Sequence, residues 1–274
     1  MKNQSIASLA NVKNIVAVAS GKGGVGKSTT SINLALALSK LGLKVGLLDA
    51  DIYGPSVAKM LGAQDNVKLE PFNETSLNPY MQYGIKAMSI AFLSNSKTPM
   101  VWRGPMASSA LNQMIAQTYW GELDYLIIDM PPGTGDIQLT ISQKIALTCA
   151  VIVTTPQEIA LLDAQKGIEM FKKVNVPVAG IVENMSLHIC TNCGHKEAIF
   201  GSDGGARLAK EYETQVLATM PLDRSIRENV DLGKPTVQAD PDSNISKLYE
   251  SMAKNLIQYI EQNTSDETVN ISFE

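Results

Sequence analysis

The stretch of sequence that decides the fold and the site of this chain is Gly21-Lys22-Gly23-Gly24-Val25-Gly26-Lys27-Ser28-Thr29. It satisfies the pattern G-x-x-x-x-G-K-[ST] of a phosphate-binding loop, in which Lys27 bridges the terminal phosphates and the Ser28 hydroxyl is a ligand of Mg²⁺. Glycines let consecutive backbone N–H groups turn towards an anion, and a helix that begins near Ser28 adds the positive end of its dipole. The letters also fit the dinucleotide pattern G-x-G-x-x-G, but a dinucleotide turn has no need for Lys27. We therefore predict that the whole stretch binds a nucleoside triphosphate.

Short apolar runs alternate with helical patterns on both sides of this loop. The pattern predicts strands at Ile15–Ala19, Val45–Leu48, Ile85–Ile90, Tyr125–Asp129, Ala150–Thr154, Val178–Val182 and Val216–Met220. It predicts helices at Ser28–Leu41, Leu111–Tyr119, Ile137–Leu147, Ile159–Val174, Gly205–Tyr212 and Ile245–Ile260.

The apolar runs are nearly continuous rather than alternating, which is typical of strands that are covered on both faces of a sheet. Together with the strand–helix alternation, they predict an α/β fold with a mainly parallel sheet flanked by helices on both faces. No internal repeat or long linker interrupts the pattern, so we expect residues 1–274 to form a single P-loop ATPase domain. Residues 1–11 and 263–274 are expected to be flexible ends, and Gln64–Tyr83 an irregular excursion.

The composition narrows the class of protein. Of the 274 residues, 45% are apolar and 18% are charged, and this apolar fraction is enough for a packed core. The net charge of −4 argues against a protein that neutralises nucleic-acid phosphates. No apolar run approaches the ~20 residues of a membrane span, and the N-terminus lacks the apolar stretch of a secretory signal. Three cysteines are too few for a disulfide scaffold. We therefore expect a cytoplasmic protein without a nucleic-acid or membrane partner.

Acidic residues end two of the predicted strands. Asp129 ends one of them, and Asp49 and Asp51 follow another. The carboxyl ends of strands face the ligand crevice in open α/β sheets, so these carboxylates should face the phosphates. We assign Asp49 and Asp129, with Ser28, to the Mg²⁺ site, where Asp129 acts through water. The alternative is that such residues only cap the helices that follow.

A pair of cysteines, Cys190 and Cys193, forms a C-x-x-C motif that places two thiolates within reach of one soft metal. Structural zinc and ordinary iron–sulfur clusters need four ligands, so the pair is incomplete. It can recruit His195 or His188, act as a thiol–disulfide couple, or be completed by the same pair of a second chain. Cys149 begins an apolar strand and is interpreted as a core residue.

Lys22 makes the loop unusual, because an ordinary phosphate-binding loop needs only Lys27. A second lysine at this position resembles the deviant phosphate-loop ATPases of the nitrogenase iron protein, the Min and Par partition proteins and the arsenite pump. That resemblance implies a MinD-like dimer in which Lys22 acts on the partner's nucleotide and Lys27 on its own. It also implies that Asp51 orients or activates the attacking water. A cation offered across the interface would stabilise the transition state as an arginine finger does.

Further motifs follow in a fixed order along the chain. They are DADIYGPS (Asp49–Ser56), DMPPGTGD (Asp129–Asp136), ENMS (Glu183–Ser186) followed by C-x-x-C, PLDRSIRE (Pro221–Glu228) and GKP (Gly233–Pro235). With the deviant loop, this set resembles the Mrp/ApbC family of iron–sulfur cluster carrier ATPases over most of the chain.

The resemblance implies a homodimer that binds and slowly hydrolyses ATP. It implies a labile [4Fe–4S] cluster that two Cys190/Cys193 pairs share and that passes to apoproteins, with cluster assembly machinery as a further partner. By the same resemblance Asn184 contacts adenine, and the stretch around Pro221 and Asp223 lines the base pocket. Because the loop already begins at Gly21, neither the N-terminal domain nor the N-terminal four-cysteine cluster of other members is expected. The proline that is usual between the two cysteines is also absent.

Two other functions remain open on these residues. A partition or site-positioning ATPase of the MinD or ParA type would explain the nucleotide motifs but not the cysteine pair. An ATPase with a dimer-bridging structural zinc would use every one of the same ligands. In the carrier interpretation, the segments Asp49–Ser56 and Asp129–Asp136 respond to the nucleotide and bias holding of the cluster against its release. Trp102 stands out in a loop, and we interpret it as packing rather than as a partner contact.

Overall fold

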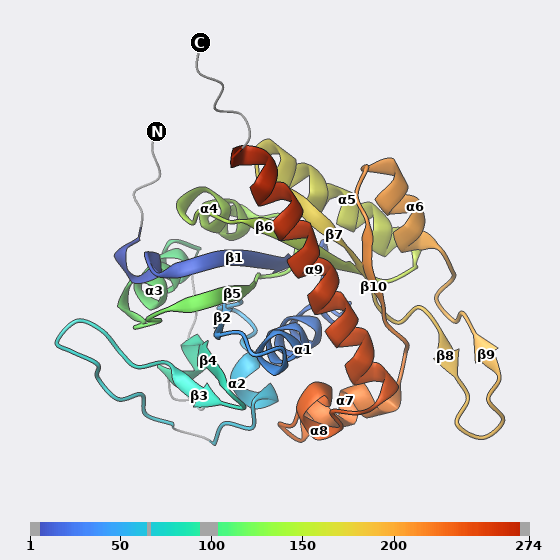
Figure 1. Ribbon diagram of the computed structural model, residues 1–274, viewed down its shortest axis with the longest axis horizontal. Coiled ribbons are helices and arrows are strands. Elements are labelled where there is room, and N and C mark those ends of the chain that lie inside the picture. The colour runs from blue at the N-terminus through green and yellow to red at the C-terminus, as the bar shows by residue number, and fades with distance from the viewer. Residues whose placement is uncertain (1–5, 65–66, 94–103, 269–274) are drawn as a thin grey trace, which may run out of the picture.

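The computed structural model describes residues 6–64, 67–93 and 104–268, with side chains up to Asn263. Trp102 and the outermost parts of the predicted flexible ends, residues 1–5 and 269–274, lie outside the described residues. In the described residues, one large sheet lies between two layers of helices (Figure 1). This confirms the predicted α/β fold.

The sheet contains eight strands in the order β10-β7-β6-β1-β5-β2-β4-β3. Their bounds are β1 (Val12–Ala19), β2 (Val45–Asp49), β3 (Tyr80–Gln82), β4 (Ile85–Met88), β5 (Leu123–Asp129), β6 (Cys149–Thr154), β7 (Val178–Glu183) and β10 (Val216–Thr219). All neighbours pair in parallel except β3 and β4, which are antiparallel. In the register of β2 with β5, Asp49 lies opposite Asp129. Strand pairing therefore makes two of the predicted site residues neighbours.

Helices cover both faces of the sheet (Figure 1). Their bounds are α1 (Lys27–Lys40), α2 (Val57–Met60), α3 (Gly104–Gln117), α4 (Asp136–Lys144), α5 (Glu158–Lys173), α6 (Gly204–Glu211), α7 (Arg224–Asp231), α8 (Thr236–Ala239) and α9 (Asn244–Thr268). Short 3₁₀ turns lie at Ala7–Leu9 and Ile90–Phe92. No helix within the described residues is long and apolar enough to cross a membrane.

Each strand of the sheet's centre contributes to two apolar cores. In β1, Val16 and Val18 join the core beneath α1 and α9, whereas Ala17 and Ala19 join the core beneath α3, α4, α5 and α6. Alternate residues of a strand point to opposite faces, so a strand between two helix layers needs apolar residues at consecutive positions. This is why the central strands are continuous apolar runs.

The structure differs from the predicted elements at several places. Helices α2, α7 and α8 were not predicted, and α3 begins at Gly104 rather than at Leu111. Leu9 is buried and the Ser8 hydroxyl donates a hydrogen bond to the carbonyl of Ile115, so the described part of the N-terminal segment packs on the domain. The end of the excursion Gln64–Tyr83 forms the edge strand β3, which is too short to show a pattern. Helix α9 runs past Ile260 to Thr268, since no glycine or proline stops it.

A second, two-stranded sheet stands apart from the main one. It consists of β8 (His188–Ile189) and β9 (Lys196–Glu197), joined by the turn that carries both cysteines of the C-x-x-C motif. Figure 1 shows this hairpin projecting from the body beside β10. We call residues 188–197 the cysteine hairpin.

Candidate functional site

The phosphate-binding loop connects β1 with α1 and is held against two other parts of the chain. Gly26 has a φ of +87°, and a Cβ added to it would lie 2.1 Å from Nδ2 of Asn184. A Cβ added to Gly21 would lie 2.1 Å from the backbone of Asp163 in α5. Glycine is therefore required at both positions, at Gly26 for the left-handed conformation as well as for space. The sequence predicted the loop and its glycines correctly, because the motif is local.

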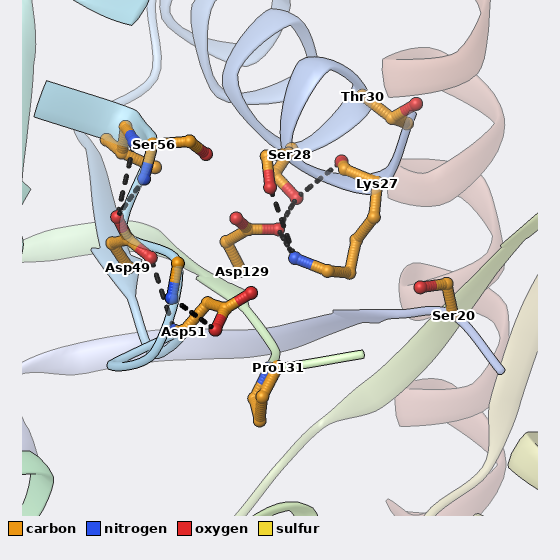
Figure 2. A network of polar contacts seen from close by, with 12 residues as sticks. Ser20, Lys27, Ser28, Thr30, Asp49, Asp51, Ser56, Asp129 and Pro131 are labelled. Carbon is orange, nitrogen blue, oxygen red and sulfur yellow. Dashed lines mark hydrogen bonds and ion pairs between the residues drawn. The ribbon is translucent and has the colours of Figure 1, made fainter. Parts of the chain in front are cut away.

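Lys27 and Asp129 form a buried ion pair at the mouth of the loop (Figure 2). The Nζ of Lys27 lies 2.7 Å from Oδ1 of Asp129, and the two side chains are 7% and 0% exposed. The Ser31 hydroxyl, one turn along α1, donates to the same oxygen at 2.8 Å. The Nζ of Lys27 also donates to the Ser28 hydroxyl at 3.2 Å. The structure thus brings Lys27, Ser28 and Asp129 together as predicted, and adds Ser31.

The other oxygen of Asp129, Oδ2, is buried without a hydrogen-bond partner among the described residues. A buried carboxylate oxygen in this state costs free energy unless a ligand completes it. Oxygen donors such as this one and the nearby Ser28 hydroxyl are the ligands that Mg²⁺ prefers, directly or through water. The donor set therefore fits the predicted magnesium ion at Ser28 and Asp129.

Asp49 is buried, and the loop that follows β2 is wrapped around its carboxylate (Figure 2). Its Oδ1 accepts a hydrogen bond from the backbone N–H of Asp51, and its Oδ2 accepts from the N–H groups of Ser56 and Val57 and from the Ser89 hydroxyl. Burial and then the negative charge of Asp129 raise the pKa of Asp49 to about 7. We had predicted Asp49 as a ligand of Mg²⁺. In this structure both of its oxygens accept hydrogen bonds from the protein, and the residue holds the loop in place.

Asp51 lies on the loop that Asp49 organises. Its Oδ1 accepts a hydrogen bond from the backbone N–H of Gly54, and it follows Asp49 in the loop after β2 (Figure 2). Asp51 and Tyr53 line a cavity of about 340 Å³ together with Pro131 and the start of α4. The side chain predicted to act on water thus lines a cavity.

The residues predicted to surround the base lie between the loop and the cysteine hairpin. Asn184, directly after β7, donates from Nδ2 to the carbonyl of Val25 at 2.8 Å. Asp223 accepts from the backbone N–H of Ser225 and so caps α7. Pro221 follows β10, and the next residue, Leu222, donates its N–H to Leu187 at the base of the hairpin. Asn184 and the Pro221–Asp223 stretch therefore flank the segment that leads to the cysteines.

The cysteine hairpin presents two thiols and no further ligand. The backbone N–H of Cys190 donates to the carbonyl of His195, and Cys193 is exposed. Hydrogen bonds from the backbone N–H groups of Cys193 and Asn192, and one with the Cys193 side chain, lower the pKa of Cys190. Among the described residues, no group of three or more His, Cys, Asp or Glu side chains is placed to hold a metal. The structure therefore shows no preformed site in which His195 or His188 joins the two cysteines within one chain.

The third cysteine, Cys149, lies fully buried at the start of β6. Burial raises its pKa to about 12, so it remains a protonated thiol. The predicted core role of Cys149 is confirmed.

Sequence reasoning missed three polar residues of this site: Ser31, Ser89 and Gln138. Ser31 follows Lys27 by one helical turn, a spacing that places it on the same side of α1 and that was available as a signal. Ser89 and Gln138 reach the site only through the pairing of β2 with β4 and through the packing of α4, for which the sequence carries no local signal.

Known proteins resemble this chain over most of its length. The family model described as ParA: NUBPL iron-transfer P-loop NTPase matches residues 11–257. An iron-sulfur cluster carrier protein of Pseudomonas fragi is 59% identical over 248 residues, which cover 90% of this chain and 86% of that protein. The iron-sulfur cluster transfer protein NUBPL of Mus musculus is 52% identical over 248 residues, covering 90% and 77%.

Solved structures give the same picture of the fold. The nucleotide-binding protein of Archaeoglobus fulgidus, in complex with ADP, superposes with a TM-score of 0.75 at 36% identity, covering 88% of this chain and 94% of that one. The cell division ATPase MinD of Pyrococcus furiosus superposes with a TM-score of 0.66 at 23% identity, covering 89% and 98%, and shares the fold.

Proposed function

Because this chain belongs to the family of NUBPL-type iron-transfer P-loop NTPases, we propose that it hydrolyses ATP and carries a [4Fe–4S] cluster between two copies of itself in the cytoplasm. It receives the cluster from assembly machinery and passes it to apoproteins. The observation that carries the proposal is the cysteine hairpin, which offers two exposed or partly exposed thiols and no third ligand among the described residues. A cluster needs four thiolates, and a two-fold axis supplies the other two.

Exposed apolar side chains around the nucleotide site support the pairing of two chains. Ile159 is 70% exposed and Leu162 is 56% exposed on α5, whose backbone touches the start of the loop. Leu162 and Leu139 line a hollow of about 670 Å³ between α5 and α4. Exposed apolar side chains that lie close together are a feature of protein–protein interfaces, and they favour an interface on this face. A second copy placed there would face the phosphate-binding loop.

The loop performs the nucleotide chemistry with its own residues. Lys27 is held by Asp129 before the nucleotide arrives, so its ammonium group is already at the place where the terminal phosphates bind. Ser28 and Asp129 would hold Mg²⁺, which would supply positive charge to the phosphate oxygens. Asp51 orients the attacking water, and Lys22 of the partner neutralises charge that develops on the phosphates.

Mixing two inactive variants tests whether Lys22 acts across the interface. We expect Lys22→Ala and Asp51→Asn chains each to lose ATP hydrolysis while they still bind nucleotide. In a mixed dimer, the Lys22→Ala chain keeps its own Asp51 and receives Lys22 from its partner, so one of two sites is intact. An equal mixture should then recover about a quarter of the wild-type rate, since about half of the dimers are mixed. If mixing recovers no activity, Lys22 does not act on the partner's nucleotide.

The contacts of the hairpin supply a route by which nucleotide and cluster influence each other. We expected the nucleotide to act on the cluster through the segments Asp49–Ser56 and Asp129–Asp136. The hydrogen bonds of the described residues instead link Val25 in the loop to Asn184, and Asn184 is six residues from Cys190. Since such coupling is reciprocal, loading of the cluster should change the affinity for ATP. Equal affinities with and without the cluster would remove this part of the proposal.

Anaerobic reconstitution with iron and sulfide tests the carrier function directly. We expect a brown dimer with about four irons per two chains, which Cys193→Ser no longer forms although it still binds nucleotide. Cys149→Ala is the matched control, because it removes a cysteine that is buried and outside the hairpin, and it should load normally. A colourless dimer with bound zinc would favour the zinc-bridged alternative. A monomer that retains its iron would refute the shared site.

A further inference from the structure

Gln138 is a buried side chain next to the nucleotide site that none of the roles above uses. It lies in the first turn of α4, directly after the segment Asp129–Asp136, and is 2% exposed. Its Nε2 donates a hydrogen bond to the carbonyl of Pro131, two residues beyond Asp129. Its Oε1 is buried and has no hydrogen-bond partner among the described residues.

The bond to Pro131 fixes which way the carboxamide faces. Only the nitrogen can donate to a carbonyl, so the oxygen is the polar atom that remains for a ligand. A buried acceptor without a partner costs about 1–3 kcal/mol, which a bound donor would recover. Gln138 lines the cavity of about 340 Å³ that Asp51 and Tyr53 also line. The side chain that carries the unpaired oxygen therefore lines the same cavity as the carboxylate that we assign to the attacking water.

We propose that Gln138 is a further catalytic residue, which holds the attacking water together with Asp51. This inference rests on the proposed ATP hydrolysis. A water molecule has two hydrogens, and the cavity offers two acceptors for them, the carboxylate of Asp51 and Oε1 of Gln138. With both hydrogens held, a lone pair of the water oxygen is left to point at the terminal phosphorus.

The step that these two residues assist is the hydrolysis of ATP. The water oxygen forms a bond to the γ-phosphorus, and the bond from that phosphorus to the bridging oxygen breaks. The bridging oxygen leaves with the electron pair as part of ADP. One proton of the water passes to the carboxylate of Asp51 and from there to the inorganic phosphate, while the hydrogen held by Gln138 stays on the phosphate oxygen. Gln138 thus orients the water without exchanging a proton.

The experiment compares Gln138→Met and Gln138→Glu with the wild-type dimer. Gln138→Met has the same length and removes the strong acceptor, and we expect it to lower kcat about 10- to 100-fold. Affinities for ADP and for a non-hydrolysable ATP analogue should stay within about twofold, whereas the affinity for ADP with aluminium fluoride should fall, because only that mimic engages the oriented water. Gln138→Glu keeps an oxygen at this place and should retain a kcat well above that of Gln138→Met. The matched control is Gln143→Met on the exposed side of α4, which should leave all of these values unchanged.

Three results would overturn the proposal. A kcat of Gln138→Met within twofold of wild type shows that no catalytic contact was removed. If Gln138→Met lowers the affinities for all three ligands equally, or if Gln138→Met and Gln138→Glu lower kcat equally, Gln138 only holds Pro131 in place. Absence of hydrolysis in the wild-type dimer rejects ATP hydrolysis itself, which is a failure of the proposed function and is distinguished by that measurement alone.

Discussion

Removal of the positive charge of Lys27, with Asp129 left in place, is expected to destabilise the nucleotide-free protein by ~3–5 kcal/mol. The magnitude follows from burial, since the Nζ–Oδ1 distance is 2.7 Å and the side chains are 7% and 0% exposed. Lys27→Met keeps most of the apolar stem and removes only the charged end. The buried carboxyl group of Asp129 then lacks its cationic partner and lies opposite a second buried carboxyl group, that of Asp49.

The cost of Lys27→Met should increase with pH. The pKa of Asp49 is raised from 3.8 to about 7, mainly by burial and then by Asp129, and the charge of Lys27 opposes that rise. A carboxyl group with a raised pKa in the folded state stabilises the fold fully below its unfolded pKa, and this stabilisation is lost as pH rises through the folded pKa. Without Lys27 the two carboxylates repel more strongly once ionised. The loss of stability is therefore expected to be larger at about pH 8 than at about pH 5.

Urea unfolding of the chelator-treated protein at these two pH values measures the effect. With an m-value of ~3 kcal/mol/M, the midpoint of Lys27→Met should fall by about 1 M or more. Adding Asp129→Asn removes the carboxyl group that has lost its partner, and it should restore part of the stability that Lys27→Met removes. Lys166→Met is the matched control, because it breaks the mostly exposed pair with Asp163 and should cost less than about 1 kcal/mol. The reasoning is refuted if Lys27→Met costs no more than this control, or if the double variant is no more stable than the single one.

Three further outcomes are expected from the same contacts. Cys190, whose pKa is lowered by backbone N–H groups, should react with iodoacetamide faster than Cys193 at about pH 7, as peptide mass spectrometry can measure; equal rates would contradict this. Gly233→Ala should lower the urea midpoint more than Gly42→Ala. Both glycines have positive φ, but only a Cβ at Gly233 would lie 2.3 Å from the Cα of another residue, Gly62; equal decreases in the midpoint would show that backbone strain is the only cause. Asn184→Ala should still load the cluster, but loading should no longer change the affinity for ATP, as titration can measure. If loading still changes that affinity, the hydrogen bond from Asn184 to Val25 does not couple the two sites.

The parts of the fold and site that were predictable from sequence are those with local signals. The glycine-rich loop is contiguous, and β1, β5 and β6 are uninterrupted apolar runs because helices cover both faces of the sheet. The strand-ending positions of Asp49 and Asp129 follow from the same runs. Their direct opposition, in contrast, depends on the pairing of β2 with β5, which no local pattern specifies.

The contacts that give these residues their roles join distant parts of the chain. Lys27 and Asp129 are 102 positions apart, and the Ser89 hydroxyl reaches Asp49 across 40 positions. Sequence alone could assign Asp49 to a metal because an isolated carboxylate is a good ligand. Only the folded chain shows four donors converging on it. The edge strand β3 was missed for another reason, since three residues are too few to express a period of two.

The segment between the phosphate-binding loop and the cysteine pair is short and pinned at both ends. Its first residue, Asn184, is hydrogen-bonded to the loop. The N–H and hydroxyl of Ser186 both donate to the carbonyl of Met220, and the carbonyl of Leu187 accepts from the N–H of Leu222. A segment held in this way has few conformations available, so a displacement at the loop is not absorbed by slack before it reaches Cys190. In the proposed dimer the same rigidity would act in reverse, because a cluster that fixes two hairpins across a two-fold axis would also restrict both loops. Nucleotide and cluster would then compete for, or cooperate in, one conformation of this segment, and the sign of that coupling would decide whether ATP favours loading or release.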